Sequence, residues 1–261
     1  MGETTGIEWT DRTWNPWQGC IKVSPGCKHC YMYRDKRRYG QDPSEVKRSK
    51  QPTFYGPLKW KDPALVFTCS WSDWFIEEAD AWREEAYDII RRTPHLTYQI
   101  LTKRPERIGA HWPDEAVDEN FHPLPNVWLG VSVESRKYLH RIDVLREIPA
   151  RLRFLSLEPL LEDLGELNLA GIGWVIVGGE SGGAEARAID MQWIRSIIAQ
   201  CRAAGVPCFV KQLGANQTDQ QWAQLAPELR LLITALKDPK GGKPEEWPAD
   251  LRVRQMPEVT A

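Results

Sequence analysis

The sequence predicts an α/β protein, specifically a partial (β/α)6-type, TIM-like barrel of parallel strands. Short apolar runs alternate along the chain with stretches of helical periodicity, which is typical of βαβ units. Several of these runs are continuously apolar, as in parallel strands that are covered on both faces. The length of 261 residues also suits a single barrel, which commonly uses about 200–250 residues. A doubly wound open sheet is the alternative.

The expected elements follow from these runs in chain order. A short strand precedes residue 20, and six further strands are expected at 65–69, 98–102, 127–133, 153–157, 174–177 and 208–210. Helices are expected at 77–92, 105–110, 136–148 and 191–204. In the last of these, Ile194, Ile197 and Cys201 recur at helical spacing. Gly205 then ends the helix.

Composition and charge are those of an ordinary globular protein. The 42% of apolar and 27% of charged residues exclude disordered, collagen-like and coiled-coil chains. We expect a cytoplasmic protein, because there is no apolar run of about 18 residues and no signal peptide at the N-terminus. The net charge of −2 excludes a strongly basic coat but allows a local basic patch. Residues 1–236 should form the barrel with its cysteine loop, and residues 237–261 an irregular surface extension.

Three of the six cysteines, Cys20, Cys27 and Cys30, lie within eleven residues. A Pro-Gly turn and a two-residue gap bring the last two thiols to one centre. In a chain without a signal peptide, clustered cysteines are more often metal ligands than disulfide partners. Two metals remain open: a [4Fe–4S] cluster with one open iron, or a structural Zn²⁺ whose fourth ligand is His29 or a distant cysteine. Cys69 ends a strand and could reach the same site.

Polar residues and glycines follow the predicted strands where ligands bind in parallel α/β folds. Acids and bases on one face would suit a zwitterionic ligand that carries hydroxyl groups. We therefore expect a cofactor and substrate pocket lined by Ser70, Asp73, Lys103, Ser132, Glu134, Glu158, Gly179 and Glu180.

The thirteen tryptophans and one basic segment have two interpretations each. Tryptophans near the cysteines and after a strand either stack on a nucleobase or are buried under loops, and we favour burial. The segment 34–50 has seven Lys or Arg against three acids and could contact phosphates. A solvated helix face followed by a loop is the favoured interpretation. The tryptophans concerned are Trp9, Trp14, Trp17, Trp71 and Trp74.

A glycine-rich stretch at 179–183 matches the G-x-S-x-G pattern of hydrolases and follows a strand. In that fold the catalytic histidine follows the serine, whereas all five histidines here precede Ser181. The stretch is therefore interpreted as a loop that lets the backbone approach a ligand.

A series of motifs occurs in order over residues 5–215. They are Thr5-Gly6-Ile7-Glu8-Trp9-Thr10, Ser24-Pro25-Gly26-Cys27, Ser70-Trp71-Ser72-Asp73, Leu101-Thr102-Lys103-Arg104-Pro105, Leu155-Ser156-Leu157-Glu158-Pro159-Leu160 and Val175-Ile176-Val177-Gly178-Gly179-Glu180. Together they resemble the three-Cys-motif proteins of phages and bacteria. That family is in turn similar to a divergent branch of the radical S-adenosylmethionine (SAM) enzymes. The cysteine spacing here is C-x6-C-x2-C, where those enzymes usually have C-x3-C-x2-C.

The resemblance implies an enzyme with a [4Fe–4S] cluster on Cys20, Cys27 and Cys30 and with SAM on the open iron. A flavodoxin- or ferredoxin-type protein would donate the electron that releases a 5′-deoxyadenosyl radical, and this radical would abstract hydrogen from the substrate. On the tryptophans and the basic segment, we expect a nucleic acid or nucleotide as substrate. The alternative is a zinc-stabilised module that binds nucleic acid or protein without redox chemistry.

Overall fold

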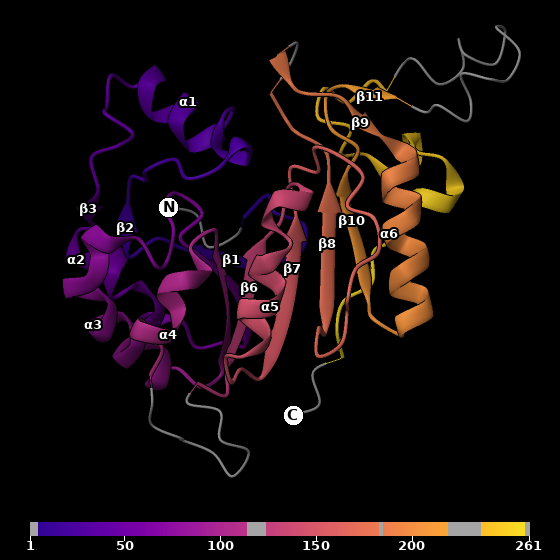
Figure 1. Ribbon diagram of the computed structural model, residues 1–261. Helices are drawn as coiled ribbons and strands as arrows, with labels where there is room; N and C mark the ends of the chain where they lie inside the picture. Colours follow the sequence, from indigo (N-terminus) through magenta and orange to yellow (C-terminus); the bar gives the residue numbers. More distant parts are fainter. Residues whose placement is uncertain (1–4, 114–123, 183–184, 219–235, 259–261) are drawn as a thin grey trace, which may run out of the picture. The chain divides into compact units, whose positions relative to one another are not determined.

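The α/β class and the parallel sheet predicted from the sequence are confirmed. The computed structural model describes residues 5–113, 124–182, 185–218 and 236–258. Gly183 of the glycine-rich loop and residues 259–261 of the expected extension lie outside these ranges. Within them, one sheet contains β1 (Arg12–Trp14), β4 (Ala64–Thr68), β5 (Leu96–Thr102), β6 (Val127–Ser132), β7 (Leu152–Leu157), β8 (Trp174–Gly178) and β10 (Cys208–Gln212), in that spatial order (Figure 1).

Strand order decides between the two architectures considered above. Each strand of this sheet lies beside its successor in the chain. That is the order of a partial (β/α) barrel, whereas a doubly wound sheet reverses direction at a switch point. The pairs β1/β4, β4/β5 and β5/β6 are parallel, with Thr13 opposite Phe67, Phe67 opposite Gln99, and Gln99 opposite Trp128. The doubly wound alternative is therefore wrong.

The predicted helices are present, and three of them begin with a 3₁₀ turn. These are α3 (Asp80–Arg91) after η3 (Glu77–Ala79), α4 (Ile108–His111) after η4 (Pro105–Arg107), and α5 (His140–Arg146) after η5 (Arg136–Tyr138). The fourth, α6 (Met191–Ala204), has the predicted bounds and lies beside β8 and β10 (Figure 1). No helix in the described ranges is long and apolar enough to span a bilayer.

Local capping explains why α6 begins and ends where the sequence predicts. Asp190 accepts a hydrogen bond from the backbone N–H of Gln192 at 2.9 Å, which satisfies one of the amides at the start of the helix. Gly205 then adopts φ 66°, a left-handed conformation that suits glycine and stops the helix.

The chain forms two compact units. Unit 1 comprises Met1–Ser132 and His140–Phe154, and unit 2 comprises Val133–Leu139 and Leu155–Ala261. Unit 1 also contains α1 (Tyr31–Arg38), α2 (Gln51–Phe54), η2 (Gly56–Lys59) and the antiparallel pair β2 (Trp17–Gln18) and β3 (Lys47–Arg48). Unit 2 also contains the parallel pair β9 (Ile189–Asp190) and β11 (Gln217–Thr218).

Most of the tryptophans near the cysteines belong to the core of unit 1, as favoured above. Trp9, Trp14, Trp17 and Trp74 are at most 3% exposed. The ring of Trp74 lies 5.0 Å from that of Trp17 and 5.9 Å from that of Trp14, between ring centroids. Trp71 is half-buried. The buried rings stabilise the loops that carry the cysteines, and they offer no surface for stacking on a base.

The C-terminal segment, expected as an irregular surface extension, lies along β10 and buries part of itself. Over 236–258 it contains η7 (Pro244–Glu246) and η8 (Ala249–Leu251), and it buries Trp247 and Leu251 in unit 2. Val210 donates its N–H to the carbonyl of Val253, and Gln255 donates to that of Cys208, both at 2.8 Å. The segment thus covers β10, which would otherwise present unpaired backbone groups at the edge of the sheet.

Candidate functional site

The cysteine loop is a short turn that leads directly into a helix. The 3₁₀ turn η1 (Pro25–Cys27) forms because Pro25 presets its backbone, and Cys27 donates its N–H to the carbonyl of Ser24 at 3.0 Å. Cys30 then occupies the N-cap position of α1, and its side chain makes no capping hydrogen bond. The loop begins at Cys20, whose N–H donates to the carbonyl of Pro43 at 3.0 Å. The predicted turn is confirmed, and it places two thiols just before the helix.

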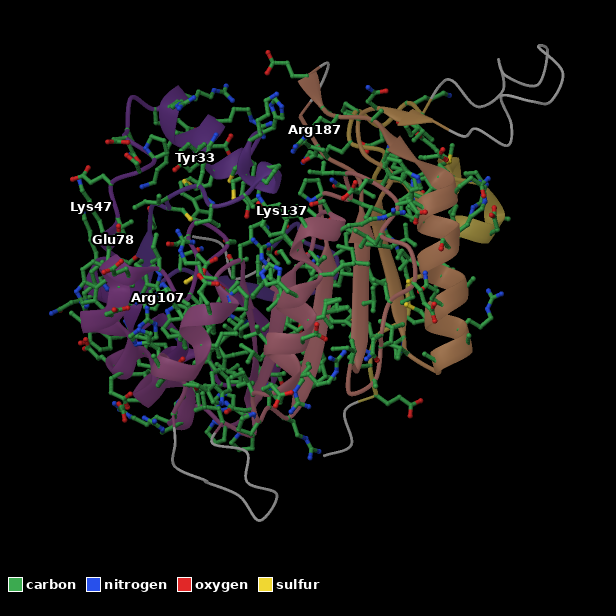
Figure 2. The ribbon with its side chains drawn as sticks, viewed as in Figure 1. Tyr33, Lys47, Glu78, Arg107, Lys137 and Arg187 are labelled. Carbon is green, nitrogen blue, oxygen red and sulfur yellow. The ribbon has the colours of Figure 1, made fainter. Side chains whose placement is uncertain are left out.

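Cys20, Cys27 and Cys30 form no disulfide and are half-buried, and all three affect the electrostatics of Tyr33 of α1. The Tyr33 hydroxyl donates to the backbone carbonyl of Cys20 (Figure 2). Burial raises the pKa of Tyr33 above its ordinary value, and the three nearby thiols raise it further. All three cysteines therefore affect the pKa of this one side chain.

Cys20 is half-buried and lies near charged side chains. Burial raises its pKa to about 12, and Asp73 and Cys27 act in the same direction, while Arg104 opposes them. Cys69, the candidate distant ligand, is 3% exposed, and burial raises its pKa well above the ordinary value. It interacts electrostatically with Cys20.

The donor set bears on which metal the loop suits. Within the described ranges, no three His, Cys, Asp or Glu side chains are arranged to hold a single metal ion. Three free thiols from one loop are ligands that an iron–sulfur cluster and a zinc ion both accept, so the donor type fits either group. The alternative fourth ligand, His29, is half-buried in the same loop.

Asp73, predicted from its place after a strand, joins the loops that follow β4 and β5. Its carboxylate accepts hydrogen bonds from the Thr102 hydroxyl at 2.6 Å, the Lys103 N–H at 2.9 Å and the Phe75 N–H at 3.0 Å. It also forms an ion pair with Arg104 at 3.4 Å. Asp73 is 6% exposed. The carboxylate therefore positions these loops.

Arg104 extends this network to the cysteine loop. It is 7% exposed, and its guanidinium donates to the carbonyl of Ile21 at 2.8 Å. A second nitrogen of the same group lies 4.0 Å from the sulfur of Cys20. Burial by itself would lower the pKa of Arg104, but Asp73 and the Cys20 thiol raise it above its ordinary value. A guanidinium that stays charged beside a thiol favours the thiolate form.

Ser70 connects the loop after β4 to the cysteine loop by a second route. Its hydroxyl accepts from the Asn15 amide at 3.0 Å, and its carbonyl accepts from the hydroxyl of Tyr31. The next residue, Trp71, donates its N–H to Asn15 at 2.8 Å and accepts from the N–H of Gly19 at 3.0 Å. Ser70 and Asp73 therefore lie beside the cysteines as part of one hydrogen-bonded edge.

In unit 2, the glycine-rich loop after β8 is held by an ion pair. Glu180 is 5% exposed and accepts from both the N–H and the guanidinium of Arg187, at 2.9 and 3.0 Å (Figure 2). A second guanidinium nitrogen contacts the other carboxylate oxygen. The carbonyl of Glu180 accepts from Ala215 at 2.9 Å. This two-pronged pair orients Arg187, which is partly exposed.

A second acid–base pair of unit 2 joins the residue that follows β7 to a residue near the end of β10. Lys211 lies 3.1 Å from a carboxylate oxygen of Glu158. The backbone of β8 ends in two glycines because space is short there. A Cβ on Gly178 would lie 2.8 Å from the Glu158 carboxylate, and one on Gly179 would lie 2.5 Å from the carbonyl oxygen of Leu213. The two glycines thus allow close packing within the unit, and the expected approach of the loop backbone to a ligand stays a prediction.

Ser132 and Glu134 are both buried. Ser132, in unit 1, is 1% exposed, and its carbonyl accepts from the guanidinium of Arg141 at 2.7 Å. Glu134, in unit 2, is 0% exposed, and its carbonyl accepts from the N–H of Leu161 at 3.0 Å.

Comparison with protein families assigns nearly the whole chain to one family. A family model described as a protein of unknown function, DUF5131, matches residues 4–247. The chain belongs to this family. No curated protein and no solved structure matches it significantly.

In this DUF5131 member, the structure brings the predicted residues together in two sets. At the edge of unit 1 lie Cys20, Cys27, Cys30, Ser70, Asp73 and Lys103. At the strand ends of unit 2 lie Glu158, Gly179 and Glu180.

Two side chains of this DUF5131 chain, Tyr33 and Arg187, were missed by the sequence reasoning. Arg104 and Lys211 were noted as bases that follow predicted strands, but they were not included in the predicted pocket. Tyr33 lies three residues after Cys30 on α1, a helical spacing that could have been used. Arg187 carries no local signal, because its partner Glu180 is chosen by the fold of the loop.

Proposed function

We propose that this protein is a radical SAM-type enzyme with a [4Fe–4S] cluster on Cys20, Cys27 and Cys30. The observation that supports this most is that three disulfide-free thiols lie within eleven residues, in a segment that is hydrogen-bonded through Tyr31 to the loop after β4 and through Ile21 to Arg104 after β5. When bound, the cluster and SAM supply a one-electron cleavage that releases a 5′-deoxyadenosyl radical able to abstract hydrogen.

The chain's own residues would prepare the cluster ligands. Arg104, neutralised in part by Asp73, lies beside the Cys20 sulfur and favours its thiolate form, which is the form that binds metal. Tyr33 holds the backbone of Cys20 through its hydroxyl. Both contacts add to the hydrogen bonds from the backbone N–H groups of Gly19 and Cys20 that hold the first ligand in place.

The strand-end residues would bind the cofactor and substrate. The carboxylate of Glu158 and the ammonium of Lys211 suit the amino and carboxylate groups of an amino-acid moiety, and nearby carbonyls suit ribose hydroxyls. Glu180 would act by orienting Arg187, since both its oxygens are already engaged by that side chain. We assign binding roles also to Ser70, Lys103, Ser132, Glu134 and Gly179, and a positioning role to Asp73.

Partners and compartment follow from this chemistry. An enzyme of this kind needs an electron donor of flavodoxin or ferredoxin type, and a nucleic acid or nucleotide is the proposed substrate. We place the enzyme in the cytoplasm, where cysteine thiols stay reduced.

The test is iron and sulfide content after anaerobic reconstitution. The wild-type protein should bind about four irons per chain and turn brown, and dithionite should bleach the colour. Cys27→Ala should lose the iron. Cys69→Ala and Cys201→Ala, which remove buried thiols outside the loop, should retain it. An iron-loaded protein should then cleave SAM.

A colourless protein that binds zinc tightly and takes up no iron would overturn the proposal. It would favour the zinc-stabilised binding module instead. In that case His29→Ala should release the zinc, whereas in an iron–sulfur enzyme the same substitution should leave the iron content unchanged.

A further inference from the structure

The segment that carries the cysteines is far more basic than the rest of the chain. Residues 20–40 contain six Lys or Arg and one acid, a net charge of +5 in a chain whose net charge is −2. Asp35 is the acid, and it pairs with Arg34 at 3.5 Å. Both side chains of this pair are more than a third exposed, so the pair neutralises little of the positive field.

Nearly all of this charge is at the surface. Lys22 and Lys28 of the cysteine loop are exposed, as are Arg34, Arg37 and Arg38 of α1. The ammonium of Lys22 lies over the ring of Tyr33, 4.6 Å from its centroid, and the guanidinium of Arg37 lies 5.8 Å from the same ring. Lys22 also donates to the carbonyl of Lys28 at 2.9 Å. A loop cation and a helix cation therefore lie beside the same ring.

Large apolar side chains are exposed among these cations. Tyr39 is 70% exposed, Ile21 44%, Val23 42% and Tyr31 38%. Tyr31 precedes Arg34 by three residues and Arg38 by seven, so it lies on the same side of the helix. Of the large apolar side chains in the described ranges that are this exposed, only Met256 lies outside the segment 21–39. We call the exposed basic and apolar side chains of residues 21–39 the α1 face.

We propose that the α1 face binds single-stranded nucleic acid, with its five exposed cations on phosphates and Tyr39 stacked on a base. Positive charge complements the backbone, and an exposed ring offers a stacking surface that is tolerant of sequence. The proposal deepens the proposed function and rests on it for the view that the bound strand is the substrate. Binding itself needs no cluster.

A strand on this face lies beside the proposed cluster. Lys22 and Lys28 stand between the cysteines in the chain, and α1 starts directly after Cys30. The competing occupant is an acidic protein, because the apolar side chains could also form the centre of a protein interface. The density of cations and the highly exposed Tyr39 favour the strand, since a stacking base needs a ring that stands in solvent.

The experiment is fluorescence anisotropy of a labelled 20-nucleotide single strand, as DNA and as RNA, titrated with the full chain at several salt concentrations. Five phosphate contacts predict a slope of log K against log salt of about −3.5, or about 100-fold weaker binding at 200 mM than at 50 mM salt. Arg37→Ala/Arg38→Ala should reduce the slope by about 1.4. Tyr39→Ala should weaken binding about tenfold and leave the slope unchanged.

The matched control is Lys59→Ala/Lys61→Ala, which removes the same charge from two exposed lysines of unit 1 outside the α1 face. It should leave both affinity and slope unchanged. Equal losses in control and test variants, or no binding of the wild type at 50 mM salt, would refute the proposal. The proposal would also be refuted if variants of the α1 face bound the single strand normally but no longer bound an acidic flavodoxin.

Measurements before and after iron reconstitution separate this proposal from the proposed function. Strand binding by a protein that takes up no iron would support the α1 face and reject the enzyme. Iron uptake and SAM cleavage without strand binding would support the enzyme and reject the role of the α1 face.

Discussion

Replacing Asp73 by Asn tests whether the buried ion pair with Arg104 holds the cysteine edge together. Both oxygens of the carboxylate are engaged: one accepts from Thr102 and Phe75, and the other accepts from Lys103 and pairs with Arg104. Asn keeps the first oxygen and its two hydrogen bonds. Its amide NH₂ replaces the second oxygen, so it faces the Lys103 N–H donor to donor and leaves Arg104 without a counter-charge.

The expected loss follows from burial. Asp73 and Arg104 are 6% and 7% exposed, so little water can solvate the remaining guanidinium. Removing one partner of a buried pair costs about 3–5 kcal/mol. At the lower value, the midpoint of thermal unfolding should fall by about 6–12 °C.

The assay is thermal unfolding followed by circular dichroism, for Asp73→Asn, Arg104→Gln and the double variant. The double variant removes both charges, so it should be more stable than the sum of the single effects predicts, by more than about 1 kcal/mol. A loss of less than about 0.5 kcal/mol in Asp73→Asn, or single effects that simply add, would show that the pair does not position this edge.

Three further predictions concern other parts of the chain. Gly179→Ala should destabilise the protein by about 1–3 kcal/mol, because the new Cβ would lie 2.5 Å from the carbonyl oxygen of Leu213. Gly182→Ala should not destabilise it, because the nearest atoms there lie 3.8 Å from the new Cβ, and urea unfolding compares the two variants. Trp247→Ala should cost about 3–5 kcal/mol in the same assay if the C-terminal segment belongs to the core, and a neutral effect would contradict that. The pKa of Asp80 is lowered because hydrogen bonds from two arginines outweigh the effect of burial, so its contribution is present above pH about 4 and lost below it. Asp80→Asn should therefore weaken the protein at neutral pH and flatten the loss of stability in acid, and parallel acid titrations of the two proteins would argue against this role.

The strands were predictable because each is a local signal. Continuous apolar runs placed all six main strands within two residues of the observed bounds. The bounds of α6 were predictable for a similar reason, since periodicity and Gly205 act within a few residues of the helix. The 3₁₀ turns that precede three helices were not predicted, because apolar periodicity does not distinguish a 3₁₀ turn from the first turn of an α-helix.

The sequence indicated where the candidate site lies, but it did not indicate which side chains contact one another there. The position after a strand indicated Asp73 and Lys103, but nothing local joins Arg104 to Ile21, which lies 83 residues away. The role of Asp73 also differs from the simplest expectation. Its oxygens are used within the protein, and a strand-end position does not reveal whether a carboxylate is engaged by its own chain.

The sequence by itself determined the α/β class, the positions of the seven strands of the main sheet along the chain, and the cysteine triad with its turn, because apolar periodicity and turn chemistry act over a few neighbouring residues. Tertiary structure alone decided the spatial order of the strands and which groups meet: Tyr33 with the Cys20 carbonyl, Arg104 beside Cys20, and the C-terminal segment along β10. Those contacts join residues far apart in the chain, and their partners are selected by packing and by the need to satisfy buried charges and backbone groups.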